Sequence, residues 1–180
     1  MKRLIMYLIV IAIAMSFGSC VFAGENLLVN PEFEKVEPMG WATYGNSVYD
    51  TETYRSGEQS GKTWVWDYGD GLFEQFVEVM PGKKYKASVY ILSKSNDAIK
   101  DGTEAWIQIE WCTKDNIIIS DPIKSSSLTA PNDIWEYFET PAVIAPSDAA
   151  KAKVKVIQQA TDSHIDGSCY FDDASFGAVE

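Results

Sequence analysis

The stretch Glu104-Ala105-Trp106-Ile107-Gln108-Ile109-Glu110-Trp111-Cys112 decides the fold class of this 180-residue chain. Ala105, Ile107, Ile109 and Trp111 occupy every second position, and Trp106, Gln108 and Glu110 occupy the positions between them. Because successive side chains of a β-strand point to opposite faces of a sheet, this alternation predicts a strand with one buried aliphatic face. The other face, which carries Trp106, Gln108 and Glu110, is expected to point toward solvent.

Alternation of the same kind recurs along the chain. In Lys84 to Ser93, apolar residues again take every second position, and further strands are predicted at 73–79, 135–140, 151–157 and 169–176. Turn dipeptides such as Pro81-Gly82 separate these runs, and no helical stripe of useful length follows residue 24. Many strands without intervening helices indicate an all-β fold, an antiparallel two-sheet β-sandwich.

The composition excludes several classes of function. Twenty-six acidic residues against 15 basic ones give a net charge of −11, which is the wrong sign for binding nucleic acid phosphates. His164 is the one histidine of the chain, and no catalytic partner for it can be recognised. Aromatic residues reach 13%. We therefore expect a binding protein rather than an enzyme, with no catalytic residues.

The first 23 residues have the pattern of a secretory signal peptide. A basic start is followed by an apolar run that is short for a membrane span, and Val21 and Ala23 are small residues before Gly24. Cleavage there would remove two basic residues and no acid, so the net charge would become −13. Residues 24–180 form a single predicted domain, secreted or extracellular. A loose lipobox at Cys20 keeps open a lipid anchor, and with it a surface-anchored or periplasmic protein.

Two cysteines, Cys112 and Cys169, remain after that cleavage. An oxidising compartment would allow them to form a disulfide, but both lie in strand-like runs far apart in sequence. Two free, buried thiols are the alternative. The spacing does not decide between these states.

Six short motifs resemble, in the same order, those of carbohydrate-binding modules of the family 4/9 type. The first is Asn26 to Glu34, which is followed by Gly40-Trp41. Ser56-Gly57, the turn from Val79 to Tyr85, and the strand Ser88-Val89-Tyr90-Ile91 come next. Asp133-Ile134-Trp135 and the closing strand Tyr170 to Phe176 complete the series.

This resemblance covers the whole predicted domain. It implies a jelly-roll β-sandwich of the galactose-binding-domain-like type, an extracellular location and frequent attachment to glycoside hydrolases. It also implies a structural calcium ion at Glu34 and Asp172, near the two ends of the domain. Calcium takes six to eight oxygen ligands, many of them carbonyls. The alternative is that both acids are solvated and bond loop backbone.

Glycan recognition requires aromatic rings that stack on sugar faces, and amides or carboxylates that bond hydroxyls. The predicted outward faces supply Trp106, Gln108, Glu110 and Tyr90. If Val65 faces the core, Trp64, Trp66 and Tyr68 form a stacking platform; the alternative places these three rings inside. The resemblance adds Gln75 as a residue of the cleft. The predicted ligand-binding set is Trp64, Trp66, Tyr68, Gln75, Tyr90, Trp106, Gln108 and Glu110.

The sequence thus predicts an exported, noncatalytic protein that binds an oligo- or polysaccharide. The excess of acids favours a neutral glycan over an anionic one. One alternative is a structural or adhesion sandwich of the cell surface whose aromatic residues meet a protein partner. Another is an accessory subunit of a glycoside hydrolase system.

Overall fold

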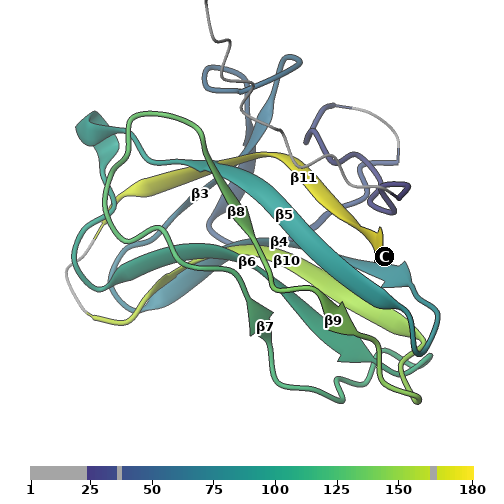
Figure 1. Ribbon diagram of the computed structural model, residues 1–180. Coiled ribbons are helices and arrows are strands. Elements are labelled where there is room, and N and C mark those ends of the chain that lie inside the picture. The colour runs from purple at the N-terminus through teal and green to yellow at the C-terminus, as the bar shows by residue number, and fades with distance from the viewer. Residues whose placement is uncertain (1–23, 36–37, 163–165) are drawn as a thin grey trace, which may run out of the picture.

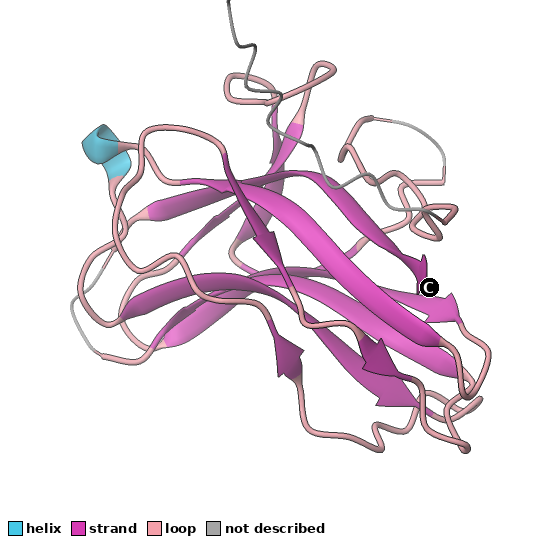
Figure 2. Cartoon of the chain, in the orientation of Figure 1, coloured by secondary structure: helices cyan, strands magenta, loops and turns pink. Residues whose placement is uncertain are grey.

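The protein is a sandwich of two antiparallel sheets (Figure 1). The computed structural model describes residues 24–35, 38–162 and 166–180. Among these residues, one short 3-10 helix, η1 (Ser95–Asp97), is the sole helix, and it lies in the loop predicted between two strands (Figure 2). The all-β fold class is therefore confirmed. No helix in the described ranges has the length and apolar character that a membrane span requires.

The first sheet has five strands in the order β1-β4-β10-β6-β7. They are β1 (Ala42–Gly45), β4 (Gly69–Glu78), β10 (Lys151–Ala160), β6 (Thr103–Cys112) and β7 (Ile123–Lys124). The long central strand β10 pairs along its whole length with both β4 and β6. The predicted strand around Ile107 is thus β6, next to the centre of this sheet.

The second sheet has the order β2-β3-β11-β5-β8, and β9 also pairs with β5. Its strands are β2 (Ser47–Asp50), β3 (Ser60–Trp64), β11 (Ser168–Val179), β5 (Lys84–Leu92), β8 (Glu136–Glu139) and β9 (Val143–Ile144). All six predicted strands are present. Strands β1, β2, β7 and β9 were not predicted, because they are short and lack an apolar alternation. The alternation from Trp64 to Tyr68 suggested a strand there, but β3 ends at Trp64 and residues 65–68 connect it to β4.

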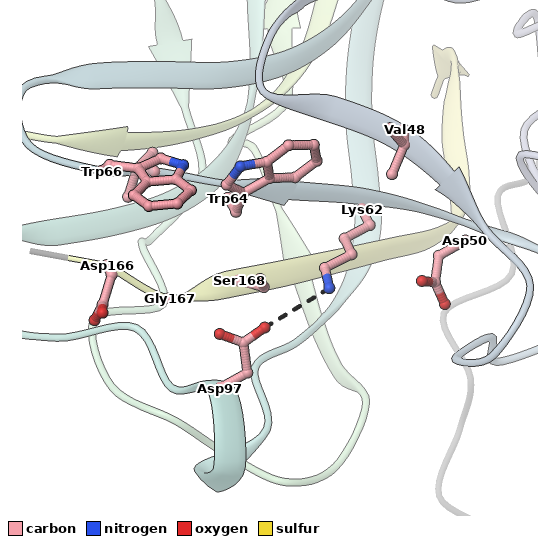
Figure 3. Close-up of a pocket in the computed structure, with 10 residues that line it drawn as sticks. Val48, Asp50, Lys62, Trp64, Trp66, Asp97, Asp166, Gly167 and Ser168 are labelled. Carbon is pink, nitrogen blue, oxygen red and sulfur yellow. Dashed lines mark ion pairs between the residues drawn. The ribbon is translucent and has the colours of Figure 1, made fainter.

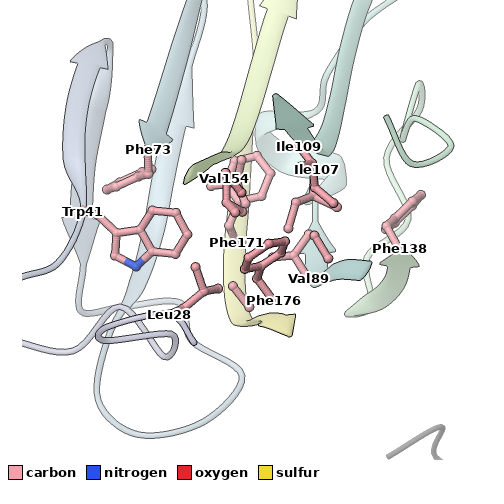
Figure 4. Packing of buried hydrophobic residues seen from close by; sticks show 14 of the residues in the cluster. Leu28, Trp41, Phe73, Val89, Ile107, Ile109, Phe138, Val154, Phe171 and Phe176 are labelled. Atoms are coloured by element: carbon pink, nitrogen blue, oxygen red, sulfur yellow. The ribbon is translucent and has the colours of Figure 1, made fainter. Parts of the chain in front are cut away.

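The core lies between the two sheets, where the alternating apolar faces meet (Figure 4). Ile107 and Ile109 from the first sheet are fully buried, as are Val89 and Phe171 from the second. Burial of each such side chain contributes about 1.5–3 kcal/mol. The predicted inward faces of β6 and β5 are confirmed.

The N-terminal motif forms a turn that packs on this core. Asn30 adopts a left-handed conformation (φ 53°), and its side chain bonds both the amide and the carbonyl of Glu34. The backbone carbonyl of Asn30 accepts a bond from the Trp41 indole at 2.8 Å. Phe33 is fully buried and stacks on Trp41 with ring centroids 4.9 Å apart. These motif residues therefore hold the fold together.

Cys112 and Cys169 are both free and buried. They lie in different sheets, β6 and β11. Burial raises the pKa of both thiols, so they stay protonated and act as small apolar side chains. Of the two possibilities left open by the sequence, a disulfide or two free thiols, the structure has two free thiols.

Candidate functional site

A cavity of about 500 Å³ opens on the outer face of the six-stranded sheet, where β3 ends and β11 begins (Figure 3). Its lining residues come from β2, β3, η1 and the start of β11, with the residues adjoining these strands. They are Val48, Asp50, Lys62, Trp64, Val65, Trp66, Asp97, Asp166, Gly167 and Ser168. The volume is in the range of small-molecule ligand pockets.

Trp64, the last residue of β3, and Trp66, in the segment that follows it, both lie on this outer face. Val65 is only 2% exposed and points into the core, so its neighbours Trp64 and Trp66 point away from it. The Trp66 side chain is 70% exposed, whereas Trp64 is half-buried. The Val65 amide donates to the Gly167 carbonyl at 3.4 Å, so pairing with the segment before β11 continues past the end of β3. Of the two arrangements open from sequence, the outward one is observed.

Polar groups stand opposite the two tryptophans. Lys62 pairs with Asp97 at 3.7 Å, and Asp166 pairs with Lys100 just outside the cavity (Figure 3 shows the first pair). Burial alone would lower the pKa of Lys62, but Tyr170, Asp97 and Asp50 outweigh it and raise that pKa. The lysine is therefore charged at neutral pH. The cavity combines two indole rings with a cation and three carboxylates.

A buried bridge between the two sheets holds Gly167, one of the lining residues, in place. Gln158 of β10 is fully buried, accepts a bond from the Thr63 hydroxyl at 2.7 Å and donates to the Gly167 carbonyl at 2.8 Å. Gly167 has φ 123°, and a Cβ on it would lie 2.1 Å from the Ala98 carbonyl oxygen. The η1 loop and the start of β11 thus approach as closely as a glycine permits.

Tyr68 is as exposed to solvent as Trp66, but it does not lie at the cavity. It is 69% exposed and lies beyond the turn at Asp67, and it does not line the cavity. The predicted three-ring platform is therefore reduced to Trp64 and Trp66 at this cavity. The reason is the left-handed conformation of Asp67 (φ 54°), which ends the alternation between Trp66 and Tyr68.

Trp106, Gln108 and Glu110 lie on the outer face of the other, five-stranded sheet. Their direction away from the core is as predicted, but their expected exposure is wrong: each is 5% exposed or less. The Trp106 indole donates to Gln108 at 2.6 Å, Gln108 donates to Glu110 at 2.8 Å, and Lys155 donates to Glu110 at 3.0 Å. These polar groups therefore bond one another, although one buried Glu110 carboxylate oxygen makes no hydrogen bond and has only the ion pair with Lys155 at 2.9 Å.

Trp106 is also covered on its ring face, because the Lys124 ammonium lies 3.9 Å from the ring centroid. Its strand neighbours across the sheet, Leu72 and Ile157, form a small apolar cluster with it. Packing by neighbours therefore explains why an outward tryptophan is buried. The sequence of one strand does not reveal these neighbours.

Tyr90 and Gln75 are engaged in contacts within the protein. The Arg55 guanidinium lies 3.6 Å above the Tyr90 ring, and Tyr137 packs beside it at 5.3 Å. Gln75 belongs to the inner face of β4, where its amide forms bonds in both directions with the backbone of Val29. The expectation that Gln75 faces a cleft is therefore wrong, since it anchors the N-terminal segment.

Glu34 and Asp172 converge on one loop, residues 55–59. Asp172 is fully buried and accepts the amides of Arg55 and Ser56 at 2.7 and 3.1 Å. Glu34 accepts the amides of Glu58 and Gln59 at 2.8 and 3.2 Å. The backbone bonds of the alternative interpretation are present, but Asp172 is not solvated.

The buried carboxylate of Asp172 lacks a cationic partner among the described side chains. Burial raises its pKa to about 6, although the amides of Arg55 and Ser56 act in the opposite direction. Arg55 pairs instead with the neighbouring Asp173. Among the described residues, no three acidic, histidine or cysteine side chains are placed so that together they could hold a metal ion. A calcium ion here would therefore take its further ligands from loop carbonyls, which is within its chemistry.

The sequence did not indicate Val48, Asp50, Lys62, Asp97 or Asp166 as site residues. They come from β2 and β3, from a polar loop and from the segment before β11, so nothing in their spacing brings them together. His164 and Cys20 lie outside the described residues.

Comparison with known proteins agrees with this architecture. No protein-family model and no curated protein matches the sequence. Among solved structures, the chain is similar to TmCBM61, solved in complex with beta-1,4-galactotriose, with 15% identity and a TM-score of 0.61. That match covers 86% of this chain and 99% of the other.

Two further structures are similar over comparable lengths. The CBM22-1 xylan-binding domain from Paenibacillus barcinonensis has 15% identity and a TM-score of 0.62, over 88% of this chain and 97% of that one. The enzymatically active domain of bacteriophage CBA120 tailspike protein 4 has 13% identity and a TM-score of 0.62. The match covers 86% of this chain but only 21% of that domain. At such identities the likeness establishes the fold, a jelly-roll sandwich of the kind found in carbohydrate-binding modules.

Proposed function

We propose that this chain binds a neutral glycan, without catalysis, in the cavity beside Trp64 and Trp66. The observation that carries the proposal is Trp66, a large apolar ring that is 70% exposed at the mouth of a cavity. Exposure of such a ring gives up burial energy, which a stacked sugar face would restore. The carboxylates and Lys62 provide acceptors and donors for hydroxyl groups.

The charge of the chain supports a neutral ligand. A net charge of −11, with three carboxylates against one lysine in the cavity lining, disfavours anionic polysaccharides. A cavity that combines indole rings with charged side chains also favours a glycan over the rival hypothesis of a protein partner, which would prefer a flat apolar patch. Assignment to the family 4/9 type, and any association with glycoside hydrolases, remain predictions.

Affinity electrophoresis against a polysaccharide panel tests the proposal. We expect retardation by at least one neutral polymer, with xylan and β-1,4-galactan as first probes, and none by polygalacturonate. Added salt should leave the retardation by a neutral polymer unchanged, because no net charge is exchanged. Absence of binding to every plant, fungal and bacterial polysaccharide tested would overturn the proposal.

We also propose that a structural calcium ion is held by Glu34 and Asp172 with carbonyls of the 55–59 loop. It would offset the buried charge of Asp172 and fix the loop to both ends of the domain. Chelation with EGTA is then expected to lower the unfolding midpoint by about 5 °C or more at pH 7.5.

Adjacent acids provide the control for this calcium experiment. Asp172→Asn should abolish the response to EGTA, whereas Asp173→Asn should retain it, because Asp173 is already paired with Arg55. A midpoint that EGTA does not change would show that the two acids only bond loop amides.

Export is proposed on the sequence pattern alone, with residues 1–23 as signal peptide. N-terminal sequencing of the exported protein should begin at Gly24, and a lipid-modified Cys20 would instead indicate surface anchoring.

A further inference from the structure

A second, smaller cavity adjoins the one beside Trp64. This second cavity, of about 230 Å³, is lined by Ser95, Asn96, Asp97, Ala98, Lys100 and Asp166. Asp97 and Asp166 line both cavities. The two spaces therefore adjoin at these side chains, and a ligand that fills the first can extend along η1 into the second.

The two tryptophans are spaced for consecutive units of a chain. Trp64 and Trp66 take alternate positions of one extended segment, and such positions are about 6–7 Å apart. That separation is comparable to the length of one sugar unit. Two neighbouring units can therefore each stack on an indole ring, which one monosaccharide cannot do. Figure 3 shows the two rings side by side on the same wall.

The second cavity is preformed, because η1 is held from several sides. The Ser95 amide donates to Asp133 at 2.7 Å, and the Ile99 amide donates to the Ser93 hydroxyl at 3.1 Å. Ile99 is 2% exposed and anchors the loop in the core. A wall that is already ordered costs little conformational entropy when a ligand binds.

Asn96 supplies the polar group most suited to a ligand in this second space. Its side chain is exposed, and an amide both donates to and accepts from hydroxyl groups. The neighbouring charges are already paired, Asp97 with Lys62 and Asp166 with Lys100. Asn96 is therefore the residue that would bond a sugar unit without first breaking an ion pair.

We infer that the site takes a run of at least three consecutive units of a glycan chain, with two units on Trp64 and Trp66 and at least one more beside η1. This inference rests on the proposed function, which it deepens by specifying an oligosaccharide stretch rather than a single sugar unit. It predicts that affinity depends on the number of sugar units.

Calorimetric titration with β-1,4-linked xylose and galactose oligosaccharides, from disaccharide to hexasaccharide, tests it. We expect affinity to rise about tenfold between the disaccharide and the tetrasaccharide and then to level off. Asn96→Ala should weaken the tetrasaccharide by about three- to tenfold, as the loss of one hydrogen bond implies, and leave the disaccharide unchanged. Ser147→Ala, in the cavity at the opposite end of the sandwich, is the control and should change neither.

The outcomes separate the two proposals. Binding that requires Trp66 but has the same affinity for all lengths would overturn the extended site and leave the proposed function standing. An Asn96→Ala variant that weakens disaccharide and tetrasaccharide equally would also overturn it. If the panel polysaccharides bind but no oligosaccharide does, the extended site is likewise rejected, and absence of all binding rejects both.

Discussion

Replacement of Trp66 by alanine is expected to weaken glycan binding by about thirtyfold, the effect of losing about 2 kcal/mol. The ring is 70% exposed, so the fold loses little when it is removed, and the free energy of unfolding should change by less than about 0.5 kcal/mol. What is lost is the stacking surface at the mouth of the cavity. Titration of the variant with the polysaccharide found in the panel, alongside thermal unfolding, measures both quantities.

Tyr68→Ala is the matched control for this experiment. Tyr68 is 69% exposed, only two residues away and aromatic, yet it does not line the cavity. The Tyr68→Ala variant should therefore bind glycan with the same affinity as the unmodified chain. A loss caused by Tyr68→Ala but not by Trp66→Ala would contradict the proposed site.

A third variant tests the alternative that the glycan binds to the outer face of the five-stranded sheet. Phe76, on the outer face of the five-stranded sheet, is 38% exposed, and the Lys153 ammonium lies 4.9 Å from its ring centroid. If Phe76→Ala abolishes binding while Trp66→Ala does not, the glycan binds to the five-stranded sheet. The residues predicted there, Trp106, Gln108 and Glu110, would then have to exchange their mutual bonds for bonds to sugar.

The fold could be predicted because its determinants are local. The alternation in β6 depends only on residues that follow one another, and it identified the buried face containing Ile107 and Ile109. The motif around Asn30 and Phe33 is also local, since the left-handed turn and the two bonds from Asn30 to Glu34 lie within five residues, and the third bond from the Asn30 side chain reaches only to Met39. Such features can be recognised in one sequence because the residues that interact to form them are neighbours along the chain.

The site could be predicted only in part, because it depends on contacts between distant segments. Trp64 and Trp66 were identified as a candidate platform. Whether their rings face outward depends on whether Val65 points into the core, and that depends on packing against the opposite sheet, which one sequence segment does not reveal. Asp97 and Asp166 are more than 60 residues apart and share a wall only because Gly167 lets β11 approach Ala98. Conversely, Gln75 and Tyr90 have side chains suited to sugars, but both make contacts within the protein. Gln75 bonds the Val29 backbone, and the Arg55 guanidinium covers the Tyr90 ring.

The prediction that Trp106 is exposed to solvent was wrong for a physical reason that applies to strands in general. Alternation gives the direction of a side chain relative to the sheet, and it was correct for this residue. It does not give solvent access, which depends on the strands on either side. Leu72, Ile157 and Lys124 come from three other strands, and together they cover the indole.

Gln158→Leu is expected to cause the largest loss of stability, about 2–4 kcal/mol. The substitution leaves the Thr63 hydroxyl and the Gly167 carbonyl without the bonds that Gln158 makes at 2.7 and 2.8 Å. Both Gln158 and Thr63 are fully buried, so water cannot replace the lost partner. For a domain of this size, the unfolding midpoint should fall by about 5–15 °C in calorimetry.

The neighbouring Gln159→Leu is the control, because Gln159 faces away from the core and is only half-buried. Its cost should stay below about 0.5 kcal/mol. Adding Thr63→Val to Gln158→Leu should recover part of the loss, since the double variant removes the unsatisfied hydroxyl together with its partner. Equal losses for the two glutamines would mean that the bridge contributes nothing specific. Gln158→Leu is also expected to weaken glycan binding at temperatures where the variant is folded, because Gly167, which lines the cavity, loses the bond from Gln158.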